Sequence, residues 1–183
     1  TLYIINATDQ YEFLEGTYND MGVWGDAAVC QTNYGIFWAN RKGCYYYDGK
    51  QIKNLLEKEG QPLLDFQKWN NAINEPVVGY NNVKKVLVIT EDHTLASNAQ
   101  PSLTDKVSYT SGATSKDWKE VFFFNLTSQS WYMGSYDMGC KGVVQTNFVN
   151  HPKVPGSLFY IHLDSTTTKL REIPSKSRSS TEK

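Results

Sequence analysis

Short apolar runs alternate with polar turns along most of the chain. Two of the turns carry strong signals, because residues 40–43 (NRKG) end in glycine and Asp48-Gly49 is a typical two-residue hairpin sequence. The runs between these turns are short enough to be strands. The pattern therefore predicts four antiparallel strands in the first complete unit, at residues 27–34, 36–40, 44–48 and 51–56.

A second unit repeats this arrangement with a long insertion. Its strands are predicted at 77–80, 85–90, 121–125 and 131–136, with an insert at 91–119 between the second and third strands. An alternative makes residues 86–89 a third strand in their own right. The insert is preferred because Gly79-Tyr80 precedes the second strand as Asn33-Tyr34 precedes Ile36.

Partial units stand at both ends of this array. A third unit has predicted strands at 142–149, 157–163 and 169–173 and lacks a fourth strand. The opening strands, at 2–6 and 11–15, match only the last two strands of a unit.

Several sequence phrases occur twice in the same order. Residues 3–10 (YIINATDQ) return as 122–129 (FFFNLTSQ), and each copy leads to an Asp-Met-Gly sequence, at 20–22 and 137–139. Gln-Thr-Asn followed by an aromatic residue comes next in both places, at 31–34 and 145–148. A shared order over this length indicates an array of repeated β-units.

Four-stranded antiparallel units that repeat at roughly 40 residues describe the blades of a β-propeller. The chain is therefore predicted to be all-β, a propeller-like array of two complete and two partial blades over residues 1–173. Known propellers have at least about four blades, so we expect a segment of a larger propeller or a ring that partner segments complete. The opening threonine, inside a predicted strand, favours a chain that begins within a longer polypeptide or has been processed.

Two segments depart from the strand pattern. Residues 61–75 carry apolar side chains near helical spacing between two prolines, which predicts a short helix with Trp69 as a packing anchor. Residues 174–183 are polar and charged, and are predicted to be a flexible tail or linker.

Composition and charge limit the classes of partner that we expect for this chain. Aromatic residues make up 14% of the 183 residues, which favours strands, and the formal net charge of -1 gives no attraction for nucleic acid. No apolar run approaches the ~20 residues of a membrane span, so no membrane insertion is expected. Cys30, Cys44 and Cys140 cannot all pair and lack Cys-x-x-Cys spacing, which predicts free, mostly buried thiols and a reducing site of synthesis.

Two resemblances bear on function. Residues 121–131, an aromatic strand followed by Asn125, a Thr-Ser turn and Trp131, resemble a kelch-type propeller blade. Residues 35–50, together with 78–80 and 85–89, resemble divergent propeller domains of tailed-phage tail, hub or nozzle proteins. The second resemblance implies a structural role in a virion tail, with synthesis in the host cytoplasm.

Catalytic chemistry is not indicated. The motifs of sialidase and WD propellers, phosphate loops, zinc proteases and calcium loops are absent, so we expect no enzyme, no cofactor and no metal. His93, His151 and His162 are scattered along the chain, which disfavours a cluster. Asp20 and Asp137, which precede the Met-Gly pairs, are interpreted as turn-capping acids rather than groups that face a channel.

Two Asn-x-Thr sequences and the long insert are candidate surface features. The sequences at 6–8 and 125–127 fit the glycosylation pattern, but turn chemistry explains both. The insert at 91–119 is rich in small polar residues and is either disordered or a recognition surface.

The leading functional hypothesis is a structural and interaction protein that presents a rigid propeller to other virion subunits and forms a homo-oligomer. The alternative is a module that binds carbohydrate or peptide, and a glycoside-processing enzyme is the least favoured. Candidate surface residues are Trp24, Tyr45 and Tyr47 as stacking platforms and His93 in the insert.

Overall fold

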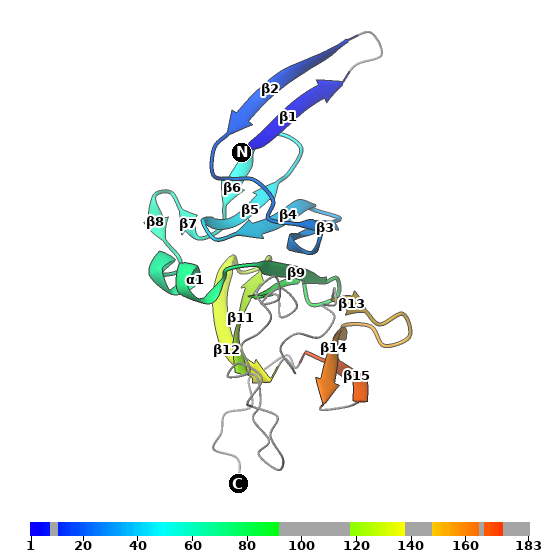
Figure 1. Ribbon diagram of the computed structural model, residues 1–183. Helices are drawn as coiled ribbons and strands as arrows, with labels where there is room; N and C mark the ends of the chain where they lie inside the picture. The colour runs from blue at the N-terminus through cyan, green and yellow to red at the C-terminus, as the bar shows by residue number, and fades with distance from the viewer. Residues whose placement is uncertain (8–10, 92–117, 138–147, 165–166, 174–183) are drawn as a thin grey trace.

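Antiparallel strands make up nearly all of the regular structure in the computed structural model, which describes residues 1–7, 11–91, 118–137, 148–164 and 167–173. Figure 1 shows three successive sheets, with a separate hairpin that projects beyond the first. The described residues also include a single turn of 3-10 helix (Asp26–Ala28) and the short helix α1 (Phe66–Ala72). The all-β prediction is confirmed, with four strands in each of the first two sheets.

The first sheet follows the chain order β3-β4-β5-β6. Its strands are β3 (Val29–Thr32), β4 (Gly35–Asn40), β5 (Gly43–Tyr47) and β6 (Ile52–Asn54). The predicted Asp48-Gly49 turn joins the last two, and Oδ1 of Asp48 accepts hydrogen bonds of 2.9 Å from the backbone N–H groups of Lys50 and Gln51. All four strands predicted for this unit are present.

The second sheet has the order β12-β11-β10-β9. Its strands are β9 (Pro76–Asn81), β10 (Val86–Glu91), β11 (Trp118–Asn125) and β12 (Ser130–Asp137). Val88 in β10 lies opposite Gly79 on one side and Phe123 on the other. Because β10 pairs with both neighbours, it is the second strand of this sheet. Glu91 belongs to β10, and Trp118 and Lys119 belong to β11, while residues 92–117 of the predicted insert lie outside the described residues.

The remaining strands form smaller sheets. The third sheet joins β13 (Val149–Asn150), β14 (Leu158–Asp164) and β15 (Thr167–Glu172). Most of the first strand predicted for it, at 142–149, lies outside the described residues. Two hairpins stand apart from these sheets: β1 (Leu2–Ala7) with β2 (Glu12–Tyr18), and β7 (Glu57–Lys58) with β8 (Gln61–Pro62).

Asparagines end three strands in the same way. The side chains of Asn40, Asn81 and Asn125 each accept hydrogen bonds from the backbone N–H groups two and three residues further on, at 2.7 to 3.2 Å. This is the Asx turn, in which a short side chain takes the place of a backbone acceptor. The turn interpretation of Asn125 is therefore confirmed, while the matching turn after Asn6 lies outside the described residues.

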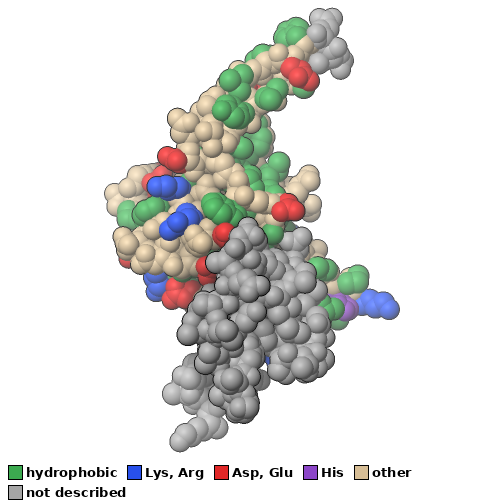
Figure 2. Space-filling model, viewed as in Figure 1, with side chains coloured by type: hydrophobic (Ala, Val, Ile, Leu, Met, Phe, Trp, Pro, Cys, Tyr) green, Lys and Arg blue, Asp and Glu red, His purple; other side chains and the backbone are tan. Residues whose placement is uncertain are grey.

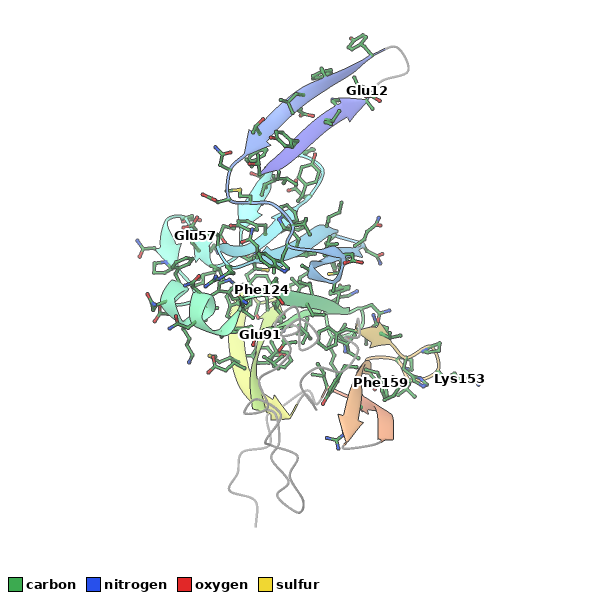
Figure 3. All side chains as sticks on the ribbon, in the orientation of Figure 1. Glu12, Glu57, Glu91, Phe124, Lys153 and Phe159 are labelled. Carbon is green, nitrogen blue, oxygen red and sulfur yellow. The ribbon has the colours of Figure 1, made fainter. Side chains whose placement is uncertain are left out.

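The larger core fills the space between the first and second sheets. It takes one face of the second sheet, with Leu87 and Ile89 from β10 and Phe122 and Phe124 from β11. Figure 3 shows Phe124 between the two sheets. Its other buried members lie in the first sheet, in the segment from the end of β6 through α1, and in β9. They are Phe37, Ala39, Cys44, Leu56, Trp69, Ile73, Val78 and Tyr80.

The smaller core lies on the other face of the second sheet. It takes the alternate residues of the same strands, with Val86 and Val88 from β10 and Val121 and Phe123 from β11. Leu158, Tyr160 and Ile173 cover them from the third sheet and the residue that follows it. Strands buried on both faces must be apolar at every position, which explains the continuous runs at 86–89 and 121–124.

Close approach between neighbouring sheets depends on Gly79. A Cβ atom added at this position would overlap the ring and Cβ of Phe148, which packs on the smaller core. The junction is also hydrogen-bonded, since Nδ2 of Asn150 donates to the carbonyl oxygen of Tyr80 at 2.7 Å. The bare backbone of Gly79 thus lets β9 lie against the third sheet.

Helix α1 covers one end of the larger core, within the segment predicted to be helical. It begins at Asp65, whose Oδ1 accepts a hydrogen bond of 2.8 Å from the N–H group of Gln67. Trp69 is fully buried, and its Nε1 donates to the carbonyl oxygen of Asn40 at 3.0 Å. Its ring centroid lies 5.2 Å from that of Phe122 and 5.8 Å from that of Trp131. The prediction that Trp69 is a packing anchor is confirmed.

Replacement of Trp69 by Ala should destabilise the chain strongly. The change empties a buried site and leaves the carbonyl oxygen of Asn40 without its indole donor. We expect the free energy of unfolding to fall by about 3–5 kcal/mol, measured by urea denaturation. Phe66→Ala, on the exposed side of the same helix, is the matched control and should cost no more than about 1 kcal/mol. Equal losses in the two variants would contradict the anchoring role.

Two of the three cysteines are described, and both are free. Burial raises the pKa of Cys30 from its ordinary value of 9.0 to about 12. Burial, followed by the neighbouring Cys30, raises the pKa of Cys44 still further. Both thiols therefore stay protonated in the folded chain at neutral pH, as expected for buried and unreactive cysteines. Cys140 lies outside the described residues.

The raised thiol pKa values predict a loss of stability at alkaline pH. Above about pH 9 the unfolded chain releases thiol protons that the folded chain still holds, so the free energy of unfolding should fall as the pH rises toward 12. Urea denaturation from neutral pH to about pH 11 would measure the decline. Cys30→Ser removes one of the titrating groups and should make the decline shallower. A decline as steep in Cys30→Ser as in the parent chain would show that this thiol does not contribute.

Candidate functional site

The hairpin of β1 and β2 is exposed over most of its length. Its strands pair antiparallel with each other, from Leu2 opposite Tyr18 to Ala7 opposite Glu12, and no other described strand joins them. Figure 1 shows the hairpin projecting beyond the first sheet, and Figure 2 shows hydrophobic side chains along it. Its exposed apolar residues are Tyr3, Ile5, Tyr11, Phe13 and Leu14.

The same sequence phrase is buried at its second occurrence. By the repeat, Tyr3 and Ile5 in β1 correspond to Phe122 and Phe124 in β11. Tyr3 and Ile5 are 59% and 62% exposed, whereas Phe122 and Phe124 are 0% and 5% exposed. In the second sheet, β10 pairs with the edge of β11 that does not pair with β12. The first sheet and α1 cover the face of β11 that carries Phe122 and Phe124. The hairpin β1–β2 therefore has the surface of half a sheet whose edge strand and cover are not supplied by the described residues.

The connection after the hairpin is held to the first sheet through its backbone. Nδ2 of Asn40 donates to the carbonyl oxygens of Asp20 and Gly22 at 2.9 and 2.7 Å, and Nε1 of Trp38 donates to that of Met21 at 2.7 Å. Asp20 has a left-handed backbone, with φ of 62°. The Asp-Met-Gly phrase thus provides carbonyl acceptors at a sharp bend. Asp20 contributes its carbonyl group here, rather than the side-chain cap that the sequence predicted.

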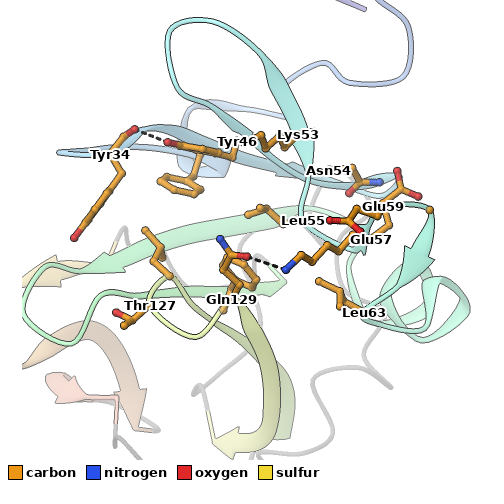
Figure 4. Close-up of a pocket in the computed structure, with 15 residues that line it drawn as sticks. Tyr34, Tyr46, Lys53, Asn54, Leu55, Glu57, Glu59, Leu63, Thr127 and Gln129 are labelled. Atoms are coloured by element: carbon orange, nitrogen blue, oxygen red, sulfur yellow. Dashed lines mark hydrogen bonds between the residues drawn. The ribbon is translucent and has the colours of Figure 1, made fainter.

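A cavity of about 760 Å³ opens between the first sheet and the turn that joins β11 to β12 (Figure 4). Its apolar wall consists of Phe37, Leu55, Leu63, Phe124 and Leu126. Its polar wall contains Lys53, Glu57, Lys58 and Glu59, together with the amides of Asn54 and Gln129. This volume falls in the range of small-molecule binding sites.

Two tyrosines form the roof of this cavity. The hydroxyl of Tyr46 donates to the carbonyl oxygen of Tyr34 at 2.7 Å, and the ring of Tyr46 stacks on Phe37 at 4.6 Å. Burial, followed by the charge of Asp48, raises the pKa of the Tyr46 hydroxyl, which keeps it protonated as a donor. Tyr34 is 48% exposed, and Nζ of Lys85 lies 5.5 Å from its ring centroid.

Rigid turns hold the opposite walls. Glu59 and Gly60 both have left-handed backbones, with φ of 52° and 78°, as in the tight two-residue turn of a hairpin. Gln129, with φ of 53°, follows the Asx turn of Asn125. Nζ of Lys58 donates to Oε1 of Gln129 at 3.4 Å, which links the two walls across the cavity (Figure 4).

The lining of the cavity combines charged, amide, hydroxyl and apolar groups. It contains two lysines and two glutamates, so its formal charges cancel. Its hydroxyl groups belong to Tyr34, Tyr46 and Thr127. The cavity offers polar donors and acceptors around an apolar wall.

The structure separates the residues predicted from sequence to form a surface. Trp24 is 50% exposed in the loop before the 3-10 turn, and Tyr47 is half-buried at the end of β5. Tyr45 is only 3% exposed, and its ring packs against Trp38 at 5.7 Å. Tyr45 therefore presents no stacking face, because it lies on the face of β5 opposite Tyr46, where its hydroxyl donates to the carbonyl oxygen of Asp20 at 3.4 Å. His93 lies outside the described residues.

Of the three histidines, the structure describes the side chain of His151. Nδ1 of His151 accepts a hydrogen bond of 3.2 Å from the N–H group of Lys153, and its ring lies 5.1 Å from that of Phe159. His162 pairs with Lys169 through the backbone of β14. Within the described parts of the chain, no three acidic, histidine or cysteine side chains are grouped to hold a metal ion.

The cavity itself was not predicted from sequence. Tyr34, Tyr46 and Lys58 belong to three separate parts of the first unit and its connection, and Gln129 belongs to the second unit. A partial signal was present, because Gln129 closes the repeated phrase that ends YIINATDQ at its first occurrence.

In the described part of the chain, no helix has the length and apolar character needed to span a membrane. No protein-family model matches the chain, and neither a curated protein nor a solved structure is significantly similar to it.

Proposed function

We propose that the chain is a non-enzymatic structural and interaction module, built from propeller-type blades, that is completed by strands added to its hairpin β1–β2. The observation that carries this proposal is the contrast between Tyr3 and Ile5, which are exposed, and Phe122 and Phe124, which are buried at the same repeat positions. An apolar surface of this kind marks an interaction site.

The packing of the described sheets supports a blade arrangement. The first strand of the second sheet, β9, contacts β3 and β4 on one side and β13 and β14 on the other. Neighbouring sheets of a propeller pack face to face around an axis, with their first strands close together. In our proposal the hairpin β1–β2 is the outer half of a further blade, and the strands that complete it come from the same polypeptide or from a partner subunit.

The assembly in which we place this module is a virion tail, as a tail, hub or nozzle component. The support is the resemblance of residues 35–50, 78–80 and 85–89 to propeller domains of tailed-phage virion proteins. Rings of identical subunits are the usual form of homo-oligomeric assemblies, so the partners are other copies of the chain and neighbouring virion subunits. The mass of the native polypeptide, and light scattering from the intact particle component, test this assignment.

A second candidate function is ligand binding, and the cavity between the first sheet and the β11–β12 turn favours it. It combines an apolar wall with polar groups held on rigid turns. This role is compatible with a structural one, because the cavity and the hairpin lie on different elements.

Hydrogen exchange should distinguish the hairpin from the sheets. A two-stranded hairpin without cover is marginally stable in water, so we expect the amides of β1 and β2 to exchange much faster than those of β10 and β11 in the isolated chain. In the assembly the hairpin amides should become protected, because an added strand takes up the edge of β1. Mass spectrometry of exchanged samples measures both states. Hairpin amides that are as protected in the isolated chain as those of β10 would contradict the proposal.

Equivalent substitutions in the two copies of the repeat should have opposite effects. Ile5→Ser should change the free energy of unfolding of the isolated chain by no more than about 0.5 kcal/mol, and should weaken assembly. Phe124→Ser, its matched counterpart in β11, should cost about 3–5 kcal/mol because it opens the larger core. Urea denaturation measures the first quantity, and size-exclusion chromatography with light scattering measures assembly. Normal assembly of Ile5→Ser would refute a role for the hairpin face.

A further inference from the structure

We propose that the cavity between the first sheet and the β11–β12 turn is a binding site for a neutral saccharide. Tyr34 provides the ring on which the sugar packs, and Glu57, Lys58 and Gln129 bind its hydroxyl groups. This site is separate from the hairpin β1–β2 and does not depend on how the sheets are completed.

The balance of charge in the wall selects against ionic ligands. Lys53 and Lys58 stand beside Glu57 and Glu59, so that an anion would meet two carboxylates and a cation would meet two ammonium groups. A like charge close to a bound ion costs binding free energy. A ligand without net charge meets neither penalty.

The polar groups in the wall match hydroxyl groups rather than purely apolar surface. A hydroxyl both donates and accepts hydrogen bonds, whereas a carboxylate only accepts and an ammonium group only donates. Glu57 and Glu59 supply acceptors and Lys58 supplies donors along one short hairpin, and Gln129 supplies both across the cavity. Adjacent hydroxyls of a sugar ring can therefore bond to neighbouring side chains of opposite kind.

Asn54 adds a further donor at the same wall. Its Oδ1 accepts a hydrogen bond of 3.1 Å from the N–H group of Leu56, and this bond orients the amide. None of the described residues accepts a hydrogen bond from its Nδ2. The amide is thus positioned by the protein on one side and can donate to a ligand on the other.

Tyr34 is placed as the stacking surface. Its backbone is fixed on both sides of the residue, because its N–H group donates to Oγ1 of Thr32 at 3.0 Å and its carbonyl oxygen accepts from Tyr46. Its ring remains 48% exposed at the mouth of the cavity, with Lys85 near it. The apolar C–H groups of a sugar pack on such a ring, while its hydroxyls remain at the polar wall.

The walls are already formed without a ligand. The left-handed residues Glu59 and Gly60 close the β7–β8 hairpin, and the Asx turn of Asn125 positions Gln129. A site whose turns are fixed before binding loses less conformational entropy when it binds. The hydrogen bond from Lys58 to Gln129, which crosses between the described walls, is long at 3.4 Å, and sugar hydroxyls can replace it.

A defined set of probes tests the proposal. An array of neutral oligosaccharides, including lactose, maltotriose, cellotriose and chitotriose, would be screened first, beside sialyllactose, heparin fragments and a leucine-rich peptide. Isothermal titration then measures the affinity of the neutral probes that bind. We expect at least one neutral saccharide to saturate the protein, with the charged glycans and the peptide binding more weakly or not at all.

Substitutions in the wall locate the bound sugar. Tyr34→Ala keeps the backbone groups of residue 34 and removes the ring, and Glu57→Gln keeps the size of the side chain and removes its charge. Each should weaken the affinity by about tenfold with the melting temperature unchanged. Trp24→Ala, at an exposed aromatic residue outside the cavity, is the matched control and should bind as the parent chain does.

Three results would overturn the proposal. They are the absence of any neutral saccharide among the binding probes, stronger binding of the charged glycans or the peptide than of every neutral glycan, and unchanged affinity in both Tyr34→Ala and Glu57→Gln. None of these results bears on the exchange or assembly of the hairpin, so a failure here is distinguishable from a failure of the structural role.

Discussion

Burial of the second sheet on both faces is the constraint on which the rest of the structure depends. Leu87 and Phe122 point toward the first sheet, while Val88 and Phe123, one position further along each strand, point toward the third. A shift of register by one residue would exchange these two sets. Both sets are apolar, so hydrophobicity alone does not determine the register. The Asx turns of Asn81 and Asn125 do so, because they determine where β9 and β11 end.

Buried polar groups then connect each sheet to the next segment of the chain. Asn40 uses both ends of its amide, since Oδ1 closes its own turn and Nδ2 binds the carbonyl groups of the Asp-Met-Gly bend. Asn81 repeats this arrangement, with Nδ2 donating to the carbonyl oxygen of Gly156 at 2.7 Å. Unpaired polar groups in these positions would be costly. One residue type thus ends a strand and also anchors a separate connection, at the end of the second strand of the first sheet and of the first strand of the second sheet.

The pattern of strands could be predicted from sequence because it rests on local physical chemistry. Turn residues, alternation and the repeat predicted both four-stranded sheets, and apolar residues at helical spacing predicted the helix around Trp69. What lay beyond local signals was which side of a strand faces inward. Tyr45, Tyr46 and Tyr47 are consecutive and chemically alike, yet Tyr45 packs on Trp38 while Tyr46 roofs the cavity. That choice is made by what packs against each face of β5.

The cavity could not be predicted from sequence, for a related reason. Its walls come from the β7–β8 hairpin and the β11–β12 turn, which meet only because the first and second sheets pack face to face. The larger core fills the space between the sheets around Ala39, Leu87 and Phe122, and Phe37 and Phe124 lie at its edge, where they also line the cavity. Toward the turns the larger core ends, and polar side chains replace it. A cleft between adjacent sheets is thus a consequence of packing sheets through their middles.

For the hairpin β1–β2, the strands could be predicted from sequence but their exposure could not. Its strands carry the same phrase as β11 and also form an antiparallel pair, but the register differs. Ile5 lies opposite Leu14 and follows a register shift, whereas Phe124 lies opposite Trp131 in a continuous register. Burial does not follow the repeat, because it requires a neighbouring strand and a covering sheet. The free energy gained by covering apolar surface, roughly 25 cal/mol per Å², is available to whatever segment supplies them. In our proposal the repeat also indicates the form of that segment: by analogy with β10, the strand added beside β1 runs antiparallel and is apolar on both faces.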